Sequence, residues 1–470
     1  MHRGRNLGLT ALAAVLLGLL YLYLDGGAPG ELPAQAVEST PAYWMLYERD
    51  PSEFRNMTVT LASGESYRVR SDMVFQDGQL LGVQNTLGQP VVVEHQPGFA
   101  LDVTGYQMML LAAQHIPVTA KYDALDLEAC GLASPAARLE IAYADGETLT
   151  LSIGNLTASG ASCYVRLSGD TAVYLAPYDL HQVMTRSLKE QHVLPGPLNV
   201  DADSAVQIAV DGPTVERVIA TRYGGDRLLP WRMDTPLVHD GSTERIAAFL
   251  AGLCAVHAEA YETTVEDAAA LAAYGLDEPL RLIAAFSDGT IRDIHVGADA
   301  GGGMVYVRMD STGDIYLLSR TQLDFAADAS LEGLLDRFVA LVPITELSQL
   351  IVTWGQERYV LTQNWINGED TVAAGYTVNG VDVPLADFSI LYSAVIGLQF
   401  DQVTNAKADG TPEACLKFHL RDGTQRQVTL YDYDAFYTLA VTDGGGRFLI
   451  RNTRVNAMIN TLQEDAYAAK

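Results

Sequence analysis

The sequence is poor in lysine and lacks the short motifs of nucleotide, zinc and serine enzymes. It contains only five lysines in 470 residues, and none of them completes a G-x-x-x-x-G-K-[ST] loop for phosphates. The patterns H-E-x-x-H and G-x-S-x-G are absent as well, which excludes a zincin helix and a serine-hydrolase elbow. The nine histidines are dispersed and are interpreted as hydrogen-bonded structural residues. The sequence therefore predicts neither a catalytic residue nor a bound cofactor.

Positive charge is scarce throughout the chain. Thirty Lys and Arg stand against 58 Asp and Glu, giving a formal net charge of -28. A surface this acidic repels phosphate backbones, so nucleic acid is excluded as a partner. The apolar fraction of 49 % and the 18 prolines are typical of a globular protein, and at about 150 residues per domain the length predicts three domains.

Cysteine is also rare, and its spacing carries no metal motif. Cys130, Cys163, Cys254 and Cys415 form no C-x-x-C pair, so no zinc site is predicted. They are best interpreted as small buried side chains. A bridge between Cys130 and Cys163 remains open, because the distance between them in space does not follow from their spacing.

One long apolar run stands at the N-terminus. Residues 7–24 are 18 residues without a charge, and as a helix they would reach about 27 Å, close to the hydrocarbon thickness of a bilayer. Arg3 and Arg5 precede the run, whereas the first charge after it is Asp25. The positive-inside rule then places the N-terminus in the cytoplasm. We predict a single-pass anchor over residues 1–24, a linker over 25–41 and an extracytoplasmic remainder.

A cleaved signal peptide is the competing interpretation of this segment. Ala34-Gln35-Ala36 has the small-residue pattern of a cleavage site. That site lies further from the apolar run than signal peptidase usually reaches, so we favour an uncleaved anchor. Both interpretations export the rest of the chain.

The exported part contains an internal repeat. Shifting the chain by about 140 residues aligns one pattern twice, and a further shift aligns a degenerate third copy. We predict repeat units over residues 42–195, 196–340 and 341–470. The glycines and prolines of the motif are Gly131, Pro135, Gly146 and Gly154 in the first copy, and Gly275, Pro279, Gly289 and Gly297 in the second.

Each copy predicts the same secondary structure. Apolar residues alternate on both sides of an Asp-Gly pair, as around Asp145-Gly146, which is typical of a β-hairpin with a type I′ turn. Two more strands follow, giving an antiparallel meander of about four strands. A helix precedes the meander, with Ser242 as its cap in the second copy. A shorter helix over 265–273 is expected to end at a left-handed Gly275. The fold class is therefore α+β: an N-terminal transmembrane helix and three tandem units, each a helix packed on a meander.

Tyrosine is unusually frequent and recurs in the strands that follow the hairpin. A half-exposed tyrosine suits either the edge of the core or a binding face. Arginines at equal offsets would bind a partner's anionic group or form an internal ion pair. The candidates for a partner-binding surface are Tyr164, Arg166, Tyr306 and Arg308, and Tyr437 is expected at the matching strand position of the third unit.

Together, the Gly-Leu-x-x-Pro step, the Asp-Gly hairpin, the glycine predicted at the strand end and the Tyr-Val-Arg strand resemble a bacterial family known as domain of unknown function 4340. The clearest match is residues 274–318, and residues 131–175 are a good second. The resemblance implies one N-terminal membrane helix, an exported body and an association with ABC-type export systems. It supplies no catalytic residues.

We therefore expect a non-enzymatic, membrane-anchored extracytoplasmic module that assists an ABC-type transporter or another envelope complex. Two alternatives remain open. One is an envelope glycan hydrolase with two acidic residues in a cleft, and the other is a binder of a small solute or wall fragment between units. The sequence identifies no small-molecule ligand.

Overall fold

The computed structural model describes residues 43–96, 98–224, 228–310, 312–366 and 372–468. Within these ranges the chain is a mixed α/β protein with antiparallel sheets. None of its described helices combines the length and the apolar character that a membrane crossing requires. The predicted anchor, 1–24, and linker, 25–41, lie outside the described residues.

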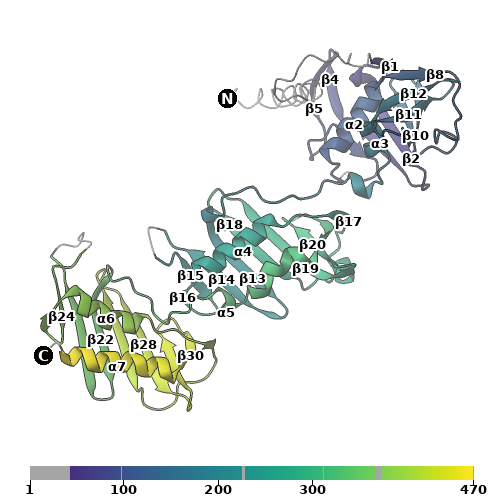
Figure 1. The fold of residues 1–470 in the computed structure, drawn as a ribbon. Coiled ribbons are helices and arrows are strands. Elements are labelled where there is room, and N and C mark those ends of the chain that lie inside the picture. Colours follow the sequence, from purple (N-terminus) through teal and green to yellow (C-terminus); the bar gives the residue numbers. More distant parts are fainter. Residues whose placement is uncertain (1–42, 97, 225–227, 311, 367–371, 469–470) are drawn as a thin grey trace, which may run out of the picture.

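Three large sheets follow one another along the molecule in chain order (Figure 1). The first sheet, in spatial order, consists of β6 (Val91–Val93), β3 (Ser66–Ser71), β2 (Phe54–Leu61), β9 (Ala137–Tyr143), β10 (Thr148–Leu156), β11 (Ser162–Leu167), β12 (Val173–Pro177) and β8 (Ala120–Tyr122). Two short ribbons accompany it: β1 (Trp44–Glu48) with β7 (His115–Val118), and β4 (Met73–Gln76) with β5 (Gln79–Val83).

The second and third sheets have nine strands each. The second consists of β16 (His239–Asp240), β15 (Trp231–Thr235), β14 (Val215–Arg222), β13 (Ala205–Gly212), β18 (Leu280–Phe286), β19 (Ile291–Gly301), β20 (Met304–Met309), β21 (Asp314–Ser319) and β17 (Ala260–Thr264). The third consists of β25 (Val381–Val383), β24 (Gly375–Val378), β23 (Glu357–Asn364), β22 (Leu347–Trp354), β27 (Ala414–Leu420), β28 (Gln425–Asp432), β29 (Tyr437–Thr442), β30 (Arg447–Arg451) and β26 (Gln402–Val403).

The strands connect in the same way in all three sheets. The hairpin that precedes the main helix pairs with the first meander strand, as β13 does with β18, and the short strand after the helix closes the far edge, as β17 does on β21. Each sheet is therefore about twice as wide as the four-strand meander that we predicted. The four meander strands are themselves neighbours in each sheet, as β18, β19, β20 and β21 are in the second. The greater width was not predicted, because local periodicity does not show which distant hairpin extends a sheet.

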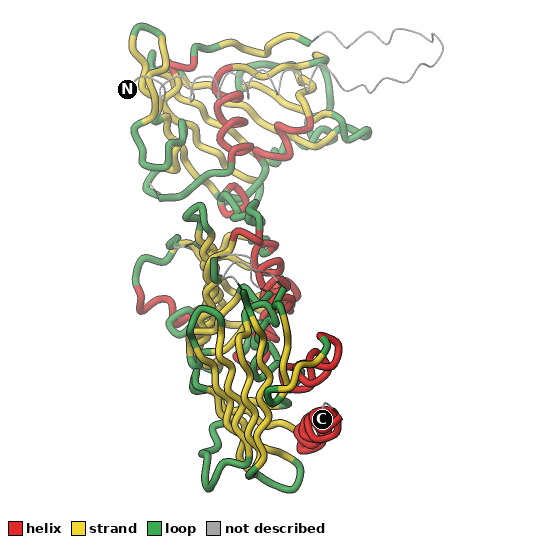
Figure 2. The backbone as a smooth tube through the Cα atoms, turned by 90° about the vertical axis from the view of Figure 1, so that its left-hand side faces the viewer, coloured by secondary structure: helices red, strands yellow, loops and turns green. Residues whose placement is uncertain are grey.

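The α-helices lie along one face of the sheets (Figure 2). The α-helices are α2 (Val103–Gln114), α3 (Tyr178–Met184), α4 (Thr243–Ala255), α5 (Leu331–Leu334), α6 (Leu385–Ile396) and α7 (Asn452–Ala468), and the 3-10 helices are η1 (Pro51–Glu53), η2 (Lys189–Gln191), η3 (Ala202–Ser204), η4 (Ala268–Tyr274) and η5 (Arg320–Asp328). In α4, the predicted cap Ser242 accepts a hydrogen bond from the amide of Arg245. The apolar stripe of this helix is buried, with Ile246 and Leu253 fully inaccessible. The opposite face is solvated, as is typical of an amphipathic helix.

The short helix before the second meander is confirmed in place but not in type. It is the 3-10 helix η4, which begins after Asp267, and the Asp267 side chain accepts from the amide of Ala269. It ends at Gly275 with φ of 64°, the left-handed conformation that glycine adopts without strain. Pro279 follows four residues later and directly precedes β18, whereas Ala136 separates Pro135 from β9.

The Asp-Gly turns form the predicted hairpins with a different turn geometry. Only the glycine has positive φ, 87° at Gly146 and 88° at Gly289, whereas a type I′ turn needs positive φ at both central residues. The connection is instead a three-residue loop with a left-handed glycine. The aspartate does not adopt positive φ, and its carboxylate accepts from the amide two residues on, Asp145 from Glu147 at 2.9 Å and Asp288 from Thr290 at 2.8 Å.

The second glycine of the motif lies inside a strand and not at its end. Gly154 and Gly297 sit at register shifts in β10 and β19. A Cβ on Gly154 would lie 2.3 Å from the carbonyl oxygen of Cys130, and one on Gly297 the same distance from that of Tyr274. The Gly-Leu step therefore packs directly onto the strand, which explains why both glycines recur together. All four cysteines are free thiols.

Candidate functional site

The structure places the predicted partner-binding residues on two separate sheets. They are Tyr164 and Arg166 on β11, and Tyr306 and Arg308 on β20. Both arginines turn back onto their own hairpin: Nε of Arg166 donates to the carbonyl oxygen of Asp170 at 2.8 Å, and Nη2 of Arg308 donates to that of Thr312 at 2.7 Å. Neither of these hydrogen bonds is the internal ion pair that we considered, because each arginine bonds a backbone carbonyl oxygen of its own turn. A role of these four residues in partner binding stays a prediction.

The tyrosine rings contact neighbours of their own sheet. Tyr164 packs against the small buried cluster of Cys130, Leu132 and Val173. Tyr306 meets Tyr274 edge to face, with ring centroids 5.0 Å apart. Both contacts favour the interpretation as edge-of-core packing.

Tyr437 does not occupy the matching position in the third sheet. Tyr306 pairs with Leu317 across β20 and β21. The counterpart of Leu317 in the third sheet is Leu449, because both pair with the closing strand at the same place. Leu449 pairs with Leu439, so Leu439 is the counterpart of Tyr306. The sequence alignment was displaced by two residues, which preserves the face of the strand but not the position.

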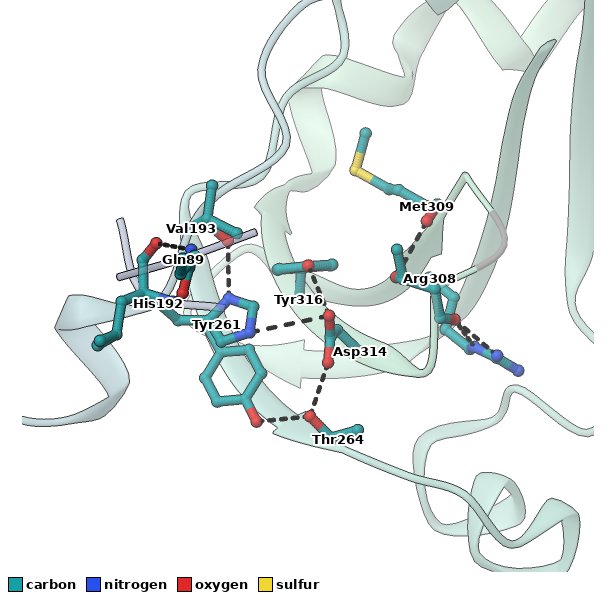
Figure 3. A network of polar contacts seen from close by, with 11 residues as sticks. Gln89, His192, Val193, Tyr261, Thr264, Arg308, Met309, Asp314 and Tyr316 are labelled. Carbon is teal, nitrogen blue, oxygen red and sulfur yellow. Dashed lines mark hydrogen bonds and ion pairs between the residues drawn. The ribbon is translucent and has the colours of Figure 1, made fainter. Parts of the chain in front are cut away.

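Side chains from different sheets meet at the two junctions between consecutive sheets. At the first junction, the imidazole of His192 stacks on the ring of Tyr261, with centroids 3.9 Å apart (Figure 3). The ring of Phe99 meets the imidazole edge-on, with centroids 4.6 Å apart. Nδ1 of His192 lies 2.7 Å from the carbonyl oxygen of Val193 and carries the proton, because a carbonyl only accepts. Nε2 faces Oδ2 of Asp314 at 3.8 Å.

The Asp314 carboxylate is held by two hydroxyl groups of the second sheet. The hydroxyl of Thr264 donates to it at 2.6 Å and that of Tyr316 at 3.1 Å (Figure 3). Burial lowers the pKa of His192, which is only 2 % exposed, while Val193 and Asp314 act in the opposite direction. Burial, together with the Asp314 carboxylate, raises the pKa of the Tyr316 hydroxyl. The junction therefore holds a neutral imidazole against a hydrogen-bonded carboxylate at neutral pH.

The second junction also contains a buried histidine. His239 is 8 % exposed and lies against Phe448, with ring centroids 4.8 Å apart, and against Phe400 at 6.0 Å. Burial lowers its pKa, against the opposing effects of Asp240 and Asp336. Nε2 of His239 is buried and has no hydrogen-bond partner among the described residues.

Polar contacts tie the same two sheets together. Nη1 of Arg426 donates to Oδ2 of Asp240 at 3.2 Å, and the amide of Val238 donates to the carbonyl oxygen of Gly444 at 3.1 Å. Asp240 is mostly shielded from solvent, with 17 % of its side chain exposed. An ion pair at this depth fixes the register of the two surfaces more strongly than one at an exposed site.

A cavity of about 500 Å³ opens between the second and third sheets. Its lining residues are Tyr223, Arg232, Val238, His239, Asp240, Val339, Ala340, Arg426, Gln427, Val428, Thr442, Asp443 and Gly444. Nη1 of Arg232 donates to the hydroxyl of Tyr223 at 2.7 Å, and its Nε pairs with Asp234 at 3.1 Å. The walls carry two cations and two carboxylates, which suits a polar ligand without net charge. Within the described ranges, no three His, Cys, Asp or Glu residues gather closely enough to hold a metal ion.

One end of each sheet, which we call its cap end, carries a residue three positions before the N-cap of the main helix. These residues are Phe99, His239 and Val381, before the N-caps Asp102, Ser242 and Pro384. Phe99 and His239 are 4 % and 8 % exposed, because each is covered by the next sheet. Val381, at the last sheet of the chain, is 44 % exposed.

The opposite side of a sheet is called its receiving side, because in the second and third sheets it contacts the preceding sheet or the segment that leads from it. Three residues after the turn glycine stand Leu149, Arg292 and Arg426 in the first, second and third sheets. Nη2 of Arg292 donates at 3.1 Å to the carbonyl oxygen of Gly196, in the segment that joins the first two sheets. Arg426 bonds Asp240 of the preceding sheet. The arginine is present in the two sheets that have a predecessor and is replaced by leucine in the first.

An aromatic ring completes the receiving side. The rings on the penultimate strand are Tyr174, Tyr316 and Phe448, and the residues paired with them on the closing strand are Lys121, Tyr261 and Val403. In the first sheet, Nζ of Lys121 lies 5.9 Å from the centre of the Tyr174 ring, and 48 % of that lysine side chain is exposed. In the first sheet, which no described sheet precedes, a charged residue thus covers the aromatic ring of the receiving side.

Acidification is expected to loosen the first junction. A histidine with a lowered folded-state pKa adds stability at higher pH, and this stability is lost as the pH falls below about 6.5, where the unfolded group binds its proton. The groups facing His192 are Asp314, Tyr261 and Tyr316. Hydrogen exchange of the 258–264 amides should accelerate between about pH 6.5 and 5 in the wild-type chain, and the change should be much smaller in His192→Phe. Equal pH profiles for the two proteins would contradict this assignment.

Comparison with protein families matches residues 106–227 and 231–417 to the family model described as "Domain of unknown function (DUF4340)". The match covers more than half of the chain and includes both copies of the glycine motif. No curated protein and no solved structure matches.

Proposed function

We propose, from the premise that the chain belongs to the DUF4340 family, that it is a non-enzymatic, membrane-anchored extracytoplasmic module. In this proposal residues 1–24 form a single-pass anchor with the N-terminus in the cytoplasm. The module is an accessory component of an ABC-type transporter or another cell-envelope complex, and its partners are subunits of that complex.

The observation that carries the proposal is the repeated way in which consecutive sheets join. We infer that the three sheets are copies of one unit, since they share their strand order and the positions that contact a neighbour. A cap end meets a receiving side at both junctions, through aromatic stacking at the first and an ion pair at the second. Modules that stack in this way form extended surfaces suited to binding proteins.

Co-purification tests this proposal. The full-length chain, tagged at its C-terminus and extracted from its native membranes in a mild detergent, is expected to recover transporter or other envelope subunits in stoichiometric amounts. A matched control is the chain with residues 1–24 replaced by a cleavable signal peptide, which should lose most of the recovery, because the anchor confines partners to one membrane plane. Recovery of the protein alone in several mild detergents would contradict the proposal.

A second candidate function is the binding of a small polar solute or wall fragment in the cavity between the second and third sheets. The buried Nε2 of His239, which has no hydrogen-bond partner among the described residues, favours it, because such a group gains a hydrogen bond from a ligand. A rise in melting temperature with N-acetylglucosamine or a muropeptide that is absent in His239→Phe would support it. Equal responses of both proteins would contradict it.

A further inference from the structure

We propose that the cap end of the third sheet is a docking surface for a protein partner that presents an arginine beside an aromatic ring at the end of an antiparallel sheet. The partner is another polypeptide and not a second copy of this chain. This inference rests on the proposed function, because it names the surface through which the module joins its complex.

The first argument is positional. Val381 stands where Phe99 and His239 stand in the first two sheets, and those two side chains are covered by a neighbouring sheet. The cap end of the third sheet keeps an apolar residue at this position, although 44 % of it is exposed. The interface that the chain uses twice within itself is therefore available a third time, at the β25 edge (Figure 1).

The second argument is charge. Asp382 stands two residues before the N-cap of α6, as Asp240 stands two residues before that of α4. Asp240 accepts a hydrogen bond from Arg426 of the next sheet at 3.2 Å. Asp382 is exposed, and its side chain forms no ion pair or hydrogen bond with the described part of the chain. Because a carboxylate pairs best with a guanidinium fork, the surface fits a partner that brings its own arginine.

The third argument excludes self-association. A second copy could offer only the receiving side of its first sheet, since the other two receiving sides are occupied. That side has Leu149 in place of the arginine, and Lys121 covers its aromatic ring. The Lys121 ammonium is paired with Asp123 at 3.6 Å and lacks the planar fork of a guanidinium. The first sheet therefore resembles the capped end of a repeat array, whereas the third does not.

Two variants of the full-length, membrane-anchored chain test the docking surface. Asp382→Arg places like charges together, and Val381→Asp removes the apolar contact. Each is expected to reduce the partner recovered in the co-purification at least about ten-fold, a loss typical of a charge pair broken at an interface. Phe436→Asp serves as the matched control, because Phe436 is 74 % exposed on the same sheet but lies outside the cap end. An unchanged melting temperature establishes that each variant is folded, and Asp382→Asn provides a milder substitution.

A photo-crosslinking residue at position 381 identifies the contact. The expected crosslink maps to a sheet end of the partner next to an arginine, and replacing that arginine by aspartate should restore recovery of the Asp382→Arg chain. A crosslink to a second copy of this chain, or undiminished recovery by both variants, would overturn the docking surface and leave the proposed function standing. If the wild-type chain recovers no partner, both are overturned.

Discussion

Replacing Asp310 by asparagine is expected to lower the free energy of unfolding of the second sheet by about 3 kcal/mol, the lower end of the range for a buried charge left without its partner. Arg292 is 2 % exposed, and its Nη1 lies 3.0 Å from Oδ2 of Asp310. Asp310 has φ of 55°, which asparagine tolerates, so the loss reports the charge and not the backbone. Hydrogen exchange of β19 and β20 peptides in increasing urea measures it.

The first sheet supplies the control for this experiment. Its residues at the two positions are Leu149 and Ser168, and Ser168 donates its amide to Thr150 as Asp310 does to Asp293. The double variant Arg292→Leu/Asp310→Asn removes the buried charge together with its partner, keeps a residue that tolerates φ of 55° at position 310, and is expected to stay within about 1 kcal/mol of the wild-type chain. A double variant as unstable as Asp310→Asn would show that the charge is not the cause.

Local structure was largely predictable from the sequence because its causes are local. The alternation around Asp145-Gly146 correctly predicts β9 and β10, and the spacing of apolar residues after Ser242 correctly predicts α4. The turn type was mispredicted, since the aspartate carboxylate bonds the amide of Glu147 and the aspartate does not adopt positive φ. That competition between side chain and backbone is not visible in a dipeptide preference.

The width of the sheets and the junction residues could not be predicted in the same way. Whether β13 joins β18 depends on contacts between segments about 75 residues apart, and periodicity reports only the buried face of each segment. His192 and His239 have no motif around them. A positional signal does exist, because Phe99 and His239 each stand three residues before a helix cap, but its meaning depends on knowing which ends of the sheets meet.

Of the two glycines in the second copy of the motif, one was predicted correctly and the other was not. Gly275 was interpreted correctly as a left-handed helix end, with φ of 64°. Gly297 was interpreted as a strand terminator, whereas β19 continues to Gly301. The two glycines recur together because of one contact, in which the carbonyl of Tyr274 lies against the backbone at Gly297.

Gly297→Ala is accordingly expected to destabilise the second sheet by about 2 to 3 kcal/mol, the upper range for an overpacked site. The new Cβ would lie 2.3 Å from the carbonyl oxygen of Tyr274 and 2.9 Å from Cγ of Leu276. The first of these atoms is backbone, so no change of rotamer relieves the clash. Gly375→Ala is the control, because its Cβ would approach no closer than 3.5 Å to the Asn364 side chain. Calorimetry should show a lowered melting transition for Gly297→Ala alone, and equal transitions for the two variants would mean that the Gly-Leu step is not held against β19.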